Sequence, residues 1–306
     1  WDQSQGSNYG HAYIDQKSDA AYTRYEVTSS GLGAQAFVGA RRTLSERQAA
    51  GDLSGKLQIN NTSWETGGAV KTSERSEIFG RLGTSFRLAN ADEFTCSTFF
   101  TCPPNTVNML KPQTSRDVET GYRRTEAWGR WTARWYQNDL VDEIGLSSDN
   151  YSNINYDPTR RKGVELDMSA QLNPHWTTGV QYANRRATFR DGAYTNKEVP
   201  MVPQQTMTVR STHKLSSTQT LMAAAQWVST QRVTGDFDNT CADKTPGYGL
   251  FNLRYTQQID SWTLSGGVNN LFDKSYYNLR TRCDPTLKSV YPEAGRTFMV
   301  TVQNRF

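Results

Sequence analysis

Four cysteines carry the most reactive side chains of this 306-residue sequence: Cys96, Cys102, Cys241 and Cys283. None belongs to a CxxC pair and the chain has only three histidines, so a zinc site is not predicted. An even cysteine count without a metal pattern indicates disulfides and an oxidising compartment. Of the three possible pairings, we favour Cys96–Cys102 within one predicted loop and Cys241–Cys283 between two neighbouring loops. Free thiols or metal ligands are the alternative.

Aromatic and basic residues in the predicted long loops are a second chemically capable set. The weak candidates for ligand contact are Phe99, Phe100, Tyr156, Arg160, Arg161, Arg190, Tyr194 and Phe237. Exposed aromatic residues and arginines are typical binding hot spots. Aromatic residues just outside a bilayer are equally typical of a membrane-barrel girdle, so that reading stays open. The three histidines are far apart and no catalytic constellation appears. We therefore predict neither an enzyme nor a cofactor or metal site.

The segments between these loops alternate apolar and polar side chains, most clearly in FMVTVQNRF at the C-terminus. Phe298, Val300, Val302 and Phe306 share one face there. An alternation of period two indicates a strand with one apolar face. An uncovered strand edge leaves backbone groups unpaired, and a barrel that closes in a membrane has no such edge. We expect this strand to close against a first strand that the chain does not contain.

The lengths of the connections are more informative than the strands themselves. We predict thirteen strands, at roughly 20–28, 32–41, 62–71, 77–87, 115–123, 126–139, 163–173, 175–188, 205–215, 218–230, 248–258, 261–271 and 296–306. Short turns alternate with long connections at 42–61, 88–114, 140–162, 189–204, 231–247 and 272–295. Outer-membrane barrels keep periplasmic turns short and let extracellular loops grow, whereas a Greek-key sandwich has no reason to alternate. The sequence predicts an all-β, transmembrane, antiparallel up-and-down barrel.

The bulk composition agrees with this class. No run of eighteen apolar residues exists, so no transmembrane helix is predicted. The 15 Tyr and 8 Trp suit two interfacial girdles. The 34 basic and 30 acidic residues are interspersed without a basic patch, which argues against nucleic acid. The chain begins at Trp1 without a signal peptide, so we expect a processed start or a longer polypeptide.

Eight motifs in order along residues 80–306 carry a family resemblance. They are GRLGTSFRLANADEF, LKPQTSRDVETGYR, YQNDLVDEIG, TRRKGVELDMSAQL, VPMVPQQTMTV, GYGLFNLRYT, GGVNNLFDKSYYN and YPEAGRTFMVTVQNRF. Together they resemble the TonB-dependent outer-membrane receptors. The resemblance implies a 22-stranded barrel with a plugged lumen, of which residues 1–306 are the C-terminal portion, starting at about strand 10. The plug domain and the first strands are then absent from this chain.

The resemblance also implies function and partners. The expected activity is TonB-coupled uptake of a scarce ligand, a ferric siderophore, another metal chelate or a cobalamin-like cofactor. A passive or structural barrel subunit of a larger assembly is the alternative. The expected location is the outer membrane of a Gram-negative-type bacterium, in contact with lipid and lipopolysaccharide. TonB would act through the missing plug, and Phe298, Val300, Val302 and Phe306 resemble the signal read by the barrel-assembly machinery.

Overall fold

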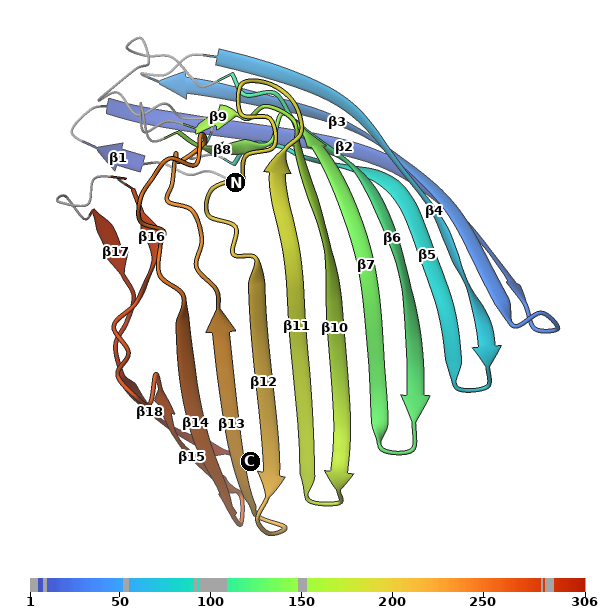
Figure 1. Ribbon diagram of the computed structural model, residues 1–306, viewed down its shortest axis with the longest axis vertical. Coiled ribbons are helices and arrows are strands. Elements are labelled where there is room, and N and C mark those ends of the chain that lie inside the picture. The colour runs from blue at the N-terminus through green and yellow to red at the C-terminus, as the bar shows by residue number, and fades with distance from the viewer. Residues whose placement is uncertain are drawn as a thin grey trace.

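The computed structural model describes residues 5–7, 10–51, 55–90, 93, 109–147, 153–281, 283 and 289–305. The regular elements among these residues are strands, and most of them lie side by side in one curved, open sheet (Figure 1). The predicted all-β antiparallel class is confirmed. Within the described ranges, no helix is long and apolar enough to cross a membrane.

The strands follow one another in the sheet almost in chain order. They are β1 (Gln5–Ser7), β2 (Gly10–Ser29), β3 (Ala34–Gly51), β4 (Gly55–Ser73), β5 (Ser76–Arg87), β6 (Gln113–Glu126), β7 (Gly129–Val141), β8 (Ile144–Leu146), β9 (Asn153–Asn155), β10 (Thr159–Asn173), β11 (Trp176–Phe189), β12 (Gln205–Lys214), β13 (Gln219–Val228), β14 (Tyr248–Ile259), β15 (Trp262–Asn269), β16 (Tyr277–Arg280), β17 (Val290–Pro292) and β18 (Thr297–Asn304). Fourteen form the main sheet, and β8–β9 and β16–β17 form two separate hairpins. Apart from the three-residue β1, the described sheet has the thirteen strands that the sequence predicts.

Each neighbouring pair in the main sheet is antiparallel, as an up-and-down order requires. The register between β10 and β11 runs from Thr159↔Phe189 to Asn173↔Trp176. The short turns lie at the lower end of the sheet in Figure 1, which we call the turn end. The longer connections gather at the opposite end, which we call the loop end.

Alternation along the strands gives the sheet two chemically different faces. The outward face carries exposed apolar side chains: Val164 and Leu166 on β10 and Val300 on β18, whose exposed fraction is 80%. The opposite, luminal face carries charged residues such as Glu165, which is the register partner of Arg134. A continuous row of exposed apolar side chains is stable only against an apolar surrounding, so the outward face forms an apolar belt.

The predicted long loop at 42–61 is wrong. Strands β3 and β4 continue through this segment as a paired ladder that reaches Ala49↔Gly55. They have 18 and 19 residues, whereas about 9–11 residues cross a bilayer. The surplus projects beyond the belt at the loop end, where the outward side chains are polar and the segment resembles a loop in sequence. Strand β2 likewise begins at Gly10 rather than near residue 20.

The buried apolar residues lie at the loop end rather than along the middle of the sheet. One cluster consists of Ala187, Phe189, Val199 and Phe237, and a smaller one of Ala89, Leu110 and Ile144. Ala187 and Phe189 share the luminal face of β11, because Glu165 pairs with Ala183 in the same register. The loops therefore fold over the luminal side of the sheet.

Candidate functional site

Aromatic side chains from three connections meet at the loop end. Tyr156 precedes β10, Tyr194 follows β11 and Phe237 lies between β13 and β14, and all three surround Phe189. The Phe237 ring lies 5.2 Å from Tyr156 and 5.3 Å from Tyr194, centroid to centroid. Phe189 is 1% exposed and Phe237 is 7% exposed. Tilted and edge-on contacts of this kind add to area burial, so the aromatic cluster is a small core that joins three loops.

Polar contacts anchor the first of these loops beneath the aromatic cluster. The Tyr156 hydroxyl donates to the carbonyl oxygen of Leu146 at 3.0 Å, and burial raises the pKa of Tyr156. The Thr159 hydroxyl donates to the buried Glu143 carboxylate at 2.6 Å, and Arg161 forms an ion pair with the same carboxylate. A buried carboxylate is stable only when it is paired and hydrogen-bonded. The predicted ligand contact Arg161 therefore already has an intramolecular partner.

Glu198 joins the second and third loops through a shared set of polar contacts. Its carboxylate accepts a hydrogen bond from Arg232 at 2.7 Å and forms an ion pair with Lys244 at 3.3 Å. Burial opposes ionisation, but the Arg232 hydrogen bond and the Lys244 charge together hold the pKa of Glu198 below its usual value. The Asn239 side chain also bonds the backbone of Glu198 in both directions. These contacts fix residues 190–204 against residues 229–247.

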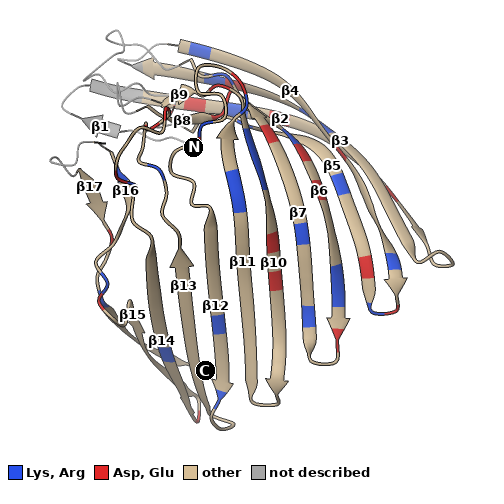
Figure 2. Cartoon of the chain, viewed as in Figure 1, with Lys and Arg blue, Asp and Glu red and all other residues tan. Residues whose placement is uncertain are grey.

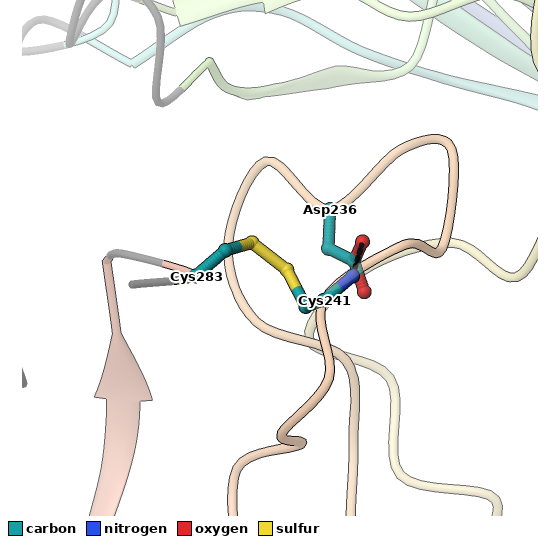
Figure 3. Close-up of side chains that lie close together, drawn as sticks. All are labelled: Asp236, Cys241 and Cys283. Atoms are coloured by element: carbon teal, nitrogen blue, oxygen red, sulfur yellow. Dashed lines mark hydrogen bonds between the residues drawn. A yellow bond between two sulfur atoms is a disulfide. The ribbon is translucent and has the colours of Figure 1, made fainter. Parts of the chain in front are cut away.

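A disulfide extends this unit to the fourth loop. Cys241 is bonded to Cys283, with a Cα–Cα distance of 5.1 Å, as predicted (Figure 3). The Cys241 amide donates to the Asp236 carboxylate at 3.0 Å. Asp236, Cys241 and Cys283 bring three ligand-type atoms within 4.8 Å of one another. Both sulfur atoms are committed to the disulfide, so this group is a structural junction. We call the described residues within 142–158, 190–204, 229–247 and 270–296 the loop cluster.

Residues of both charge signs occur along the strands below the loop cluster (Figure 2), and their ion pairs place many of them on the luminal face. Arg134 pairs with Glu119 on one neighbouring strand and Glu165 on the other. Glu65 pairs with Arg24 at 2.7 Å and Arg81 at 3.3 Å. These groups are partly exposed, so each pair contributes little to stability but keeps the wall polar. We call this stretch of β2–β10 the luminal wall.

Two glycines open space in this wall. Gly39 is the register partner of both Arg24 and Glu65, and its lack of a side chain lets Arg24 reach across it. Gly83 lies opposite Glu65, and an added Cβ there would come within 2.8 Å of a backbone oxygen. The hollow around these glycines has a volume of about 590 Å³ and also contacts Asp117. A second hollow of about 610 Å³ surrounds Arg134. The wall can therefore accept polar side chains from a partner in the lumen.

The predicted ligand contacts separate into different places. Tyr156, Tyr194 and Phe237 lie on the luminal side in the loop cluster, and Arg161 lies on the luminal face of β10 beside Glu143 of that cluster. Arg160 and Arg190 instead pair with Asp139, on the outward face. The remaining predicted residues Phe99, Phe100, Cys96, Cys102 and Phe306 lie outside the described residues. Sequence reasoning missed Phe189 and Glu198. The alternation with Ala187 places Phe189 on the luminal face, but nothing in the sequence singles out Glu198.

Comparison with known proteins agrees with this architecture. Residues 1–271 match the family described as TonB dependent receptor-like, beta-barrel. The catecholate siderophore receptor Fiu of Escherichia coli K12 is 20% identical over 255 residues, 81% of this chain and 33% of Fiu. A ferric-pyoverdine 358 receptor of Pseudomonas putida is 24% identical over 225 residues, 68% of this chain and 27% of that receptor.

Solved structures show the same fold at low identity. The ferric yersiniabactin receptor FyuA of Yersinia pestis superposes with a TM-score of 0.73 at 16% identity, over 97% of this chain and 47% of FyuA. The copper transporter OprC superposes with a TM-score of 0.72 at 20% identity, over 96% of this chain and 47% of OprC. The chain thus spans between about a quarter and a half of the length of these relatives.

Proposed function

The chain belongs to the TonB-dependent receptor β-barrel family, and from that premise we propose that it forms the C-terminal part of an outer-membrane receptor for a metal chelate. Uptake is active and coupled to TonB through a plug domain that occupies the lumen. The observation that carries the proposal is the combination of an outward apolar belt, a charged luminal wall and a joined loop cluster above it. A receptor needs these three surfaces to stay in the membrane, hold a plug and capture a ligand.

The luminal wall supports the placement of a plug. Its ion pairs leave partly exposed groups of both signs, and the hollows beside Gly39 and Arg134 have room for polar side chains. Lumen-filling domains are common in large outer-membrane barrels. We infer that residues 1–306 are the C-terminal portion of the barrel and that the plug and the first strands belong to the same polypeptide. The relatives support this inference, because each is more than twice as long as the part that this chain matches.

The ligand class follows from the relatives rather than from a single side chain. Fiu, FyuA and the pyoverdine receptor are named for ferric chelates, and OprC is named for copper. Tyr156 and Tyr194 at the edge of the aromatic cluster are only partly buried, and with Arg161 they provide aromatic and cationic groups of the type that binds anionic, ring-containing chelates. We therefore propose a ferric siderophore or a related metal chelate as the cargo.

The test is uptake by the complete receptor in a Gram-negative host that lacks its own chelate receptors. We expect saturable entry of one radiolabelled ferric chelate from a panel, lost in a host without TonB and after a protonophore. Flux that continues without TonB would overturn active uptake and favour a passive or structural barrel.

Two adjacent arginines provide a matched test of ligand contact. Arg161→Gln changes the luminal side of β10, whereas Arg160→Gln changes the outward face of the same strand. We expect chelate binding to weaken in Arg161→Gln and to stay unchanged in Arg160→Gln, with limited proteolysis as the check on loop integrity. Equal binding by both variants would contradict a ligand role for Arg161.

A further inference from the structure

Cations gather on the outward face just beyond the apolar belt, on the side of the loop end. The group comprises Arg116 on β6, Arg160 and Lys162 on β10, Arg186 on β11 and Arg190 directly after β11. We call these five residues the outer basic cluster. The first four lie on three strands that, with β7 between β6 and β10, are consecutive in the sheet.

The register fixes the common face of these cations. Lys162 lies two residues beyond Val164, whose side chain is part of the belt and is 51% exposed, so both point outward. Arg186 is the direct register partner of Lys162. Asp139 is the register partner of both Arg116 and Arg160. The cations therefore form two adjacent rows across neighbouring strands.

The outer basic cluster has fewer acids than cations: Asp139 lies among them, and Glu198, which lines a hollow together with Arg186, is already paired with Arg232 and Lys244. Asp139 pairs with Arg160 at 2.6 Å and with Arg190 at 3.4 Å. Within the described part of the chain, Arg116, Lys162 and Arg186 form no ion pair. Like charges directly opposite each other weaken a strand pair. Lys162 and Arg186 lie directly opposite each other and repel, so their arrangement is unfavourable unless an anion from outside the chain lies between them.

The outward face of β3 and β4 differs, although it also extends beyond the belt. Lys56 there pairs with Glu46 at 2.9 Å, and Arg42 donates to the Asn60 side chain at 3.2 Å. In that sector Lys56 has an acidic partner and Arg42 has a side-chain hydrogen bond. Among the described residues, outward cations without a side-chain partner are therefore concentrated on β6, β10 and β11.

We propose that the outer basic cluster binds the phosphate groups of an outer-leaflet lipid whose acyl chains lie against the belt. This lipid proposal shares one premise with the proposed function, namely that the apolar belt lies in the outer membrane. Guanidinium groups bind phosphate oxygens in a bidentate manner, and lysine adds a point charge. The cations continue directly into the exposed apolar row of Val164 and Leu166, so a phosphorylated lipid matches both surfaces. Free phosphate would match only the cations.

The test uses the complete receptor in detergent and native mass spectrometry of bound lipid. The probes are lipid A, dephosphorylated lipid A with the same acyl chains, and inorganic phosphate. The variant is Lys162→Gln/Arg186→Gln, and the matched control is Arg42→Gln/Lys56→Gln, which removes two cations from the outward face of β3 and β4. Heat-modifiable gel mobility checks that both variants are folded barrels.

We expect the Lys162→Gln/Arg186→Gln variant to bind lipid A about thirtyfold more weakly, since the loss of each of the two cations should weaken binding to a lipid surface by a similar factor. The control should bind lipid A as tightly as the unmodified receptor does. Removal of the lipid phosphates should weaken binding to the unmodified receptor about as much as the double substitution does. Equal loss in the control, or equal binding of dephosphorylated lipid A, would overturn the proposal. Competition by inorganic phosphate at equal concentration would reassign the site to free phosphate.

Uptake in the same cells separates the two proposals. A receptor that transports the chelate without phosphate-dependent lipid binding contradicts only the lipid site. A receptor that binds lipid through the outer basic cluster but does not transport contradicts only the proposed function.

Discussion

The loop cluster and the luminal wall both contain many charged residues, but they use them in different ways. In the loop cluster, charges surround a buried aromatic core and are largely removed from solvent, as for Glu143 beside Arg161. In the luminal wall, pairs such as Arg24–Glu65 lie on an open sheet face and stay partly exposed. Buried groups depend on their partners, whereas exposed pairs contribute little.

The difference follows from how each region is held together. The backbone ladder alone positions the wall, because its strands β2–β7 and β10 are each paired on both sides. The loops have less ladder of their own: the hairpins β8–β9 and β16–β17, and the isolated bridges Thr188↔Glu198 and Gln231↔Thr245. Their position therefore depends more strongly on side chains: the aromatic cluster, the Glu198 contacts and the disulfide. Side-chain substitutions should therefore disturb the loop cluster strongly and the wall weakly.

The largest effect is expected from Phe189→Ala. Removal of a buried phenylalanine costs about 3–5 kcal/mol, and Phe189 contacts aromatic rings from three loops. Native-state hydrogen exchange should show faster exchange in residues 190–204 and 229–247 and little change in the strands. Tyr22→Ala is the control, because Tyr22 lies on the luminal wall with 79% exposure. Equal protection of the loops in both variants would contradict the view that the loop cluster depends on its buried side chains more than the wall does.

The next effect is expected from the double substitution Cys241→Ser/Cys283→Ser. The disulfide closes a segment with a sequence separation of 42, and loss of such a cross-link typically costs about 2–4 kcal/mol. Limited proteolysis should cut residues 270–296 first. Residues 190–204 should stay protected, because Glu198 holds them without the disulfide. Simultaneous cleavage of both loops would mean that the disulfide supports the whole loop cluster.

The sequence predicted the wall better than the loops for a physical reason. Inside the belt, apolar surroundings impose a strict alternation, and predicted strands such as 163–173 and 218–230 correspond to β10 and β13. Beyond the belt the outward face of β3 and β4 is mostly polar and the luminal face is mixed, so the extension of β3 was predicted as a loop. A strand can be identified from its alternation only where its two faces meet different surroundings.

The loop contacts were partly predictable. Neighbouring loops on one side of an up-and-down barrel made Cys241–Cys283 a plausible pair, and the structure contains that bond. The alternation with Val164 also shows that Arg160 faces outward, although we grouped it with the ligand contacts. The meeting of Tyr156 and Phe237 depends on how loops far apart in sequence fold over the lumen. No local pattern encodes that fold.

A moderate effect with a defined pH dependence is expected from Glu198. Its folded-state pKa is lowered, so its stabilisation is present above the ordinary glutamate value of 4.5 and is lost as pH falls below it. Hydrogen exchange in residues 229–247 should therefore accelerate in acid. Glu198→Gln should cost about 1–2 kcal/mol at neutral pH and flatten this acid response. An unchanged acid response in Glu198→Gln would show that Glu198 is not the group responsible for it.

The smallest effect is expected from the luminal wall itself. Arg134 bridges Glu119 and Glu165 on the two neighbouring strands, yet it is partly exposed. Exposed ion pairs contribute about 0–1 kcal/mol, so Arg134→Gln should leave the melting temperature of the barrel nearly unchanged. A double-mutant cycle with Glu165→Gln measures the pair directly, and high salt should reduce the coupling further. A coupling as large as the Phe189→Ala effect would mean that the wall also depends on its side chains. A small coupling would agree with the proposed plug, because pairs that contribute so little can be exchanged for contacts with a luminal domain at low cost.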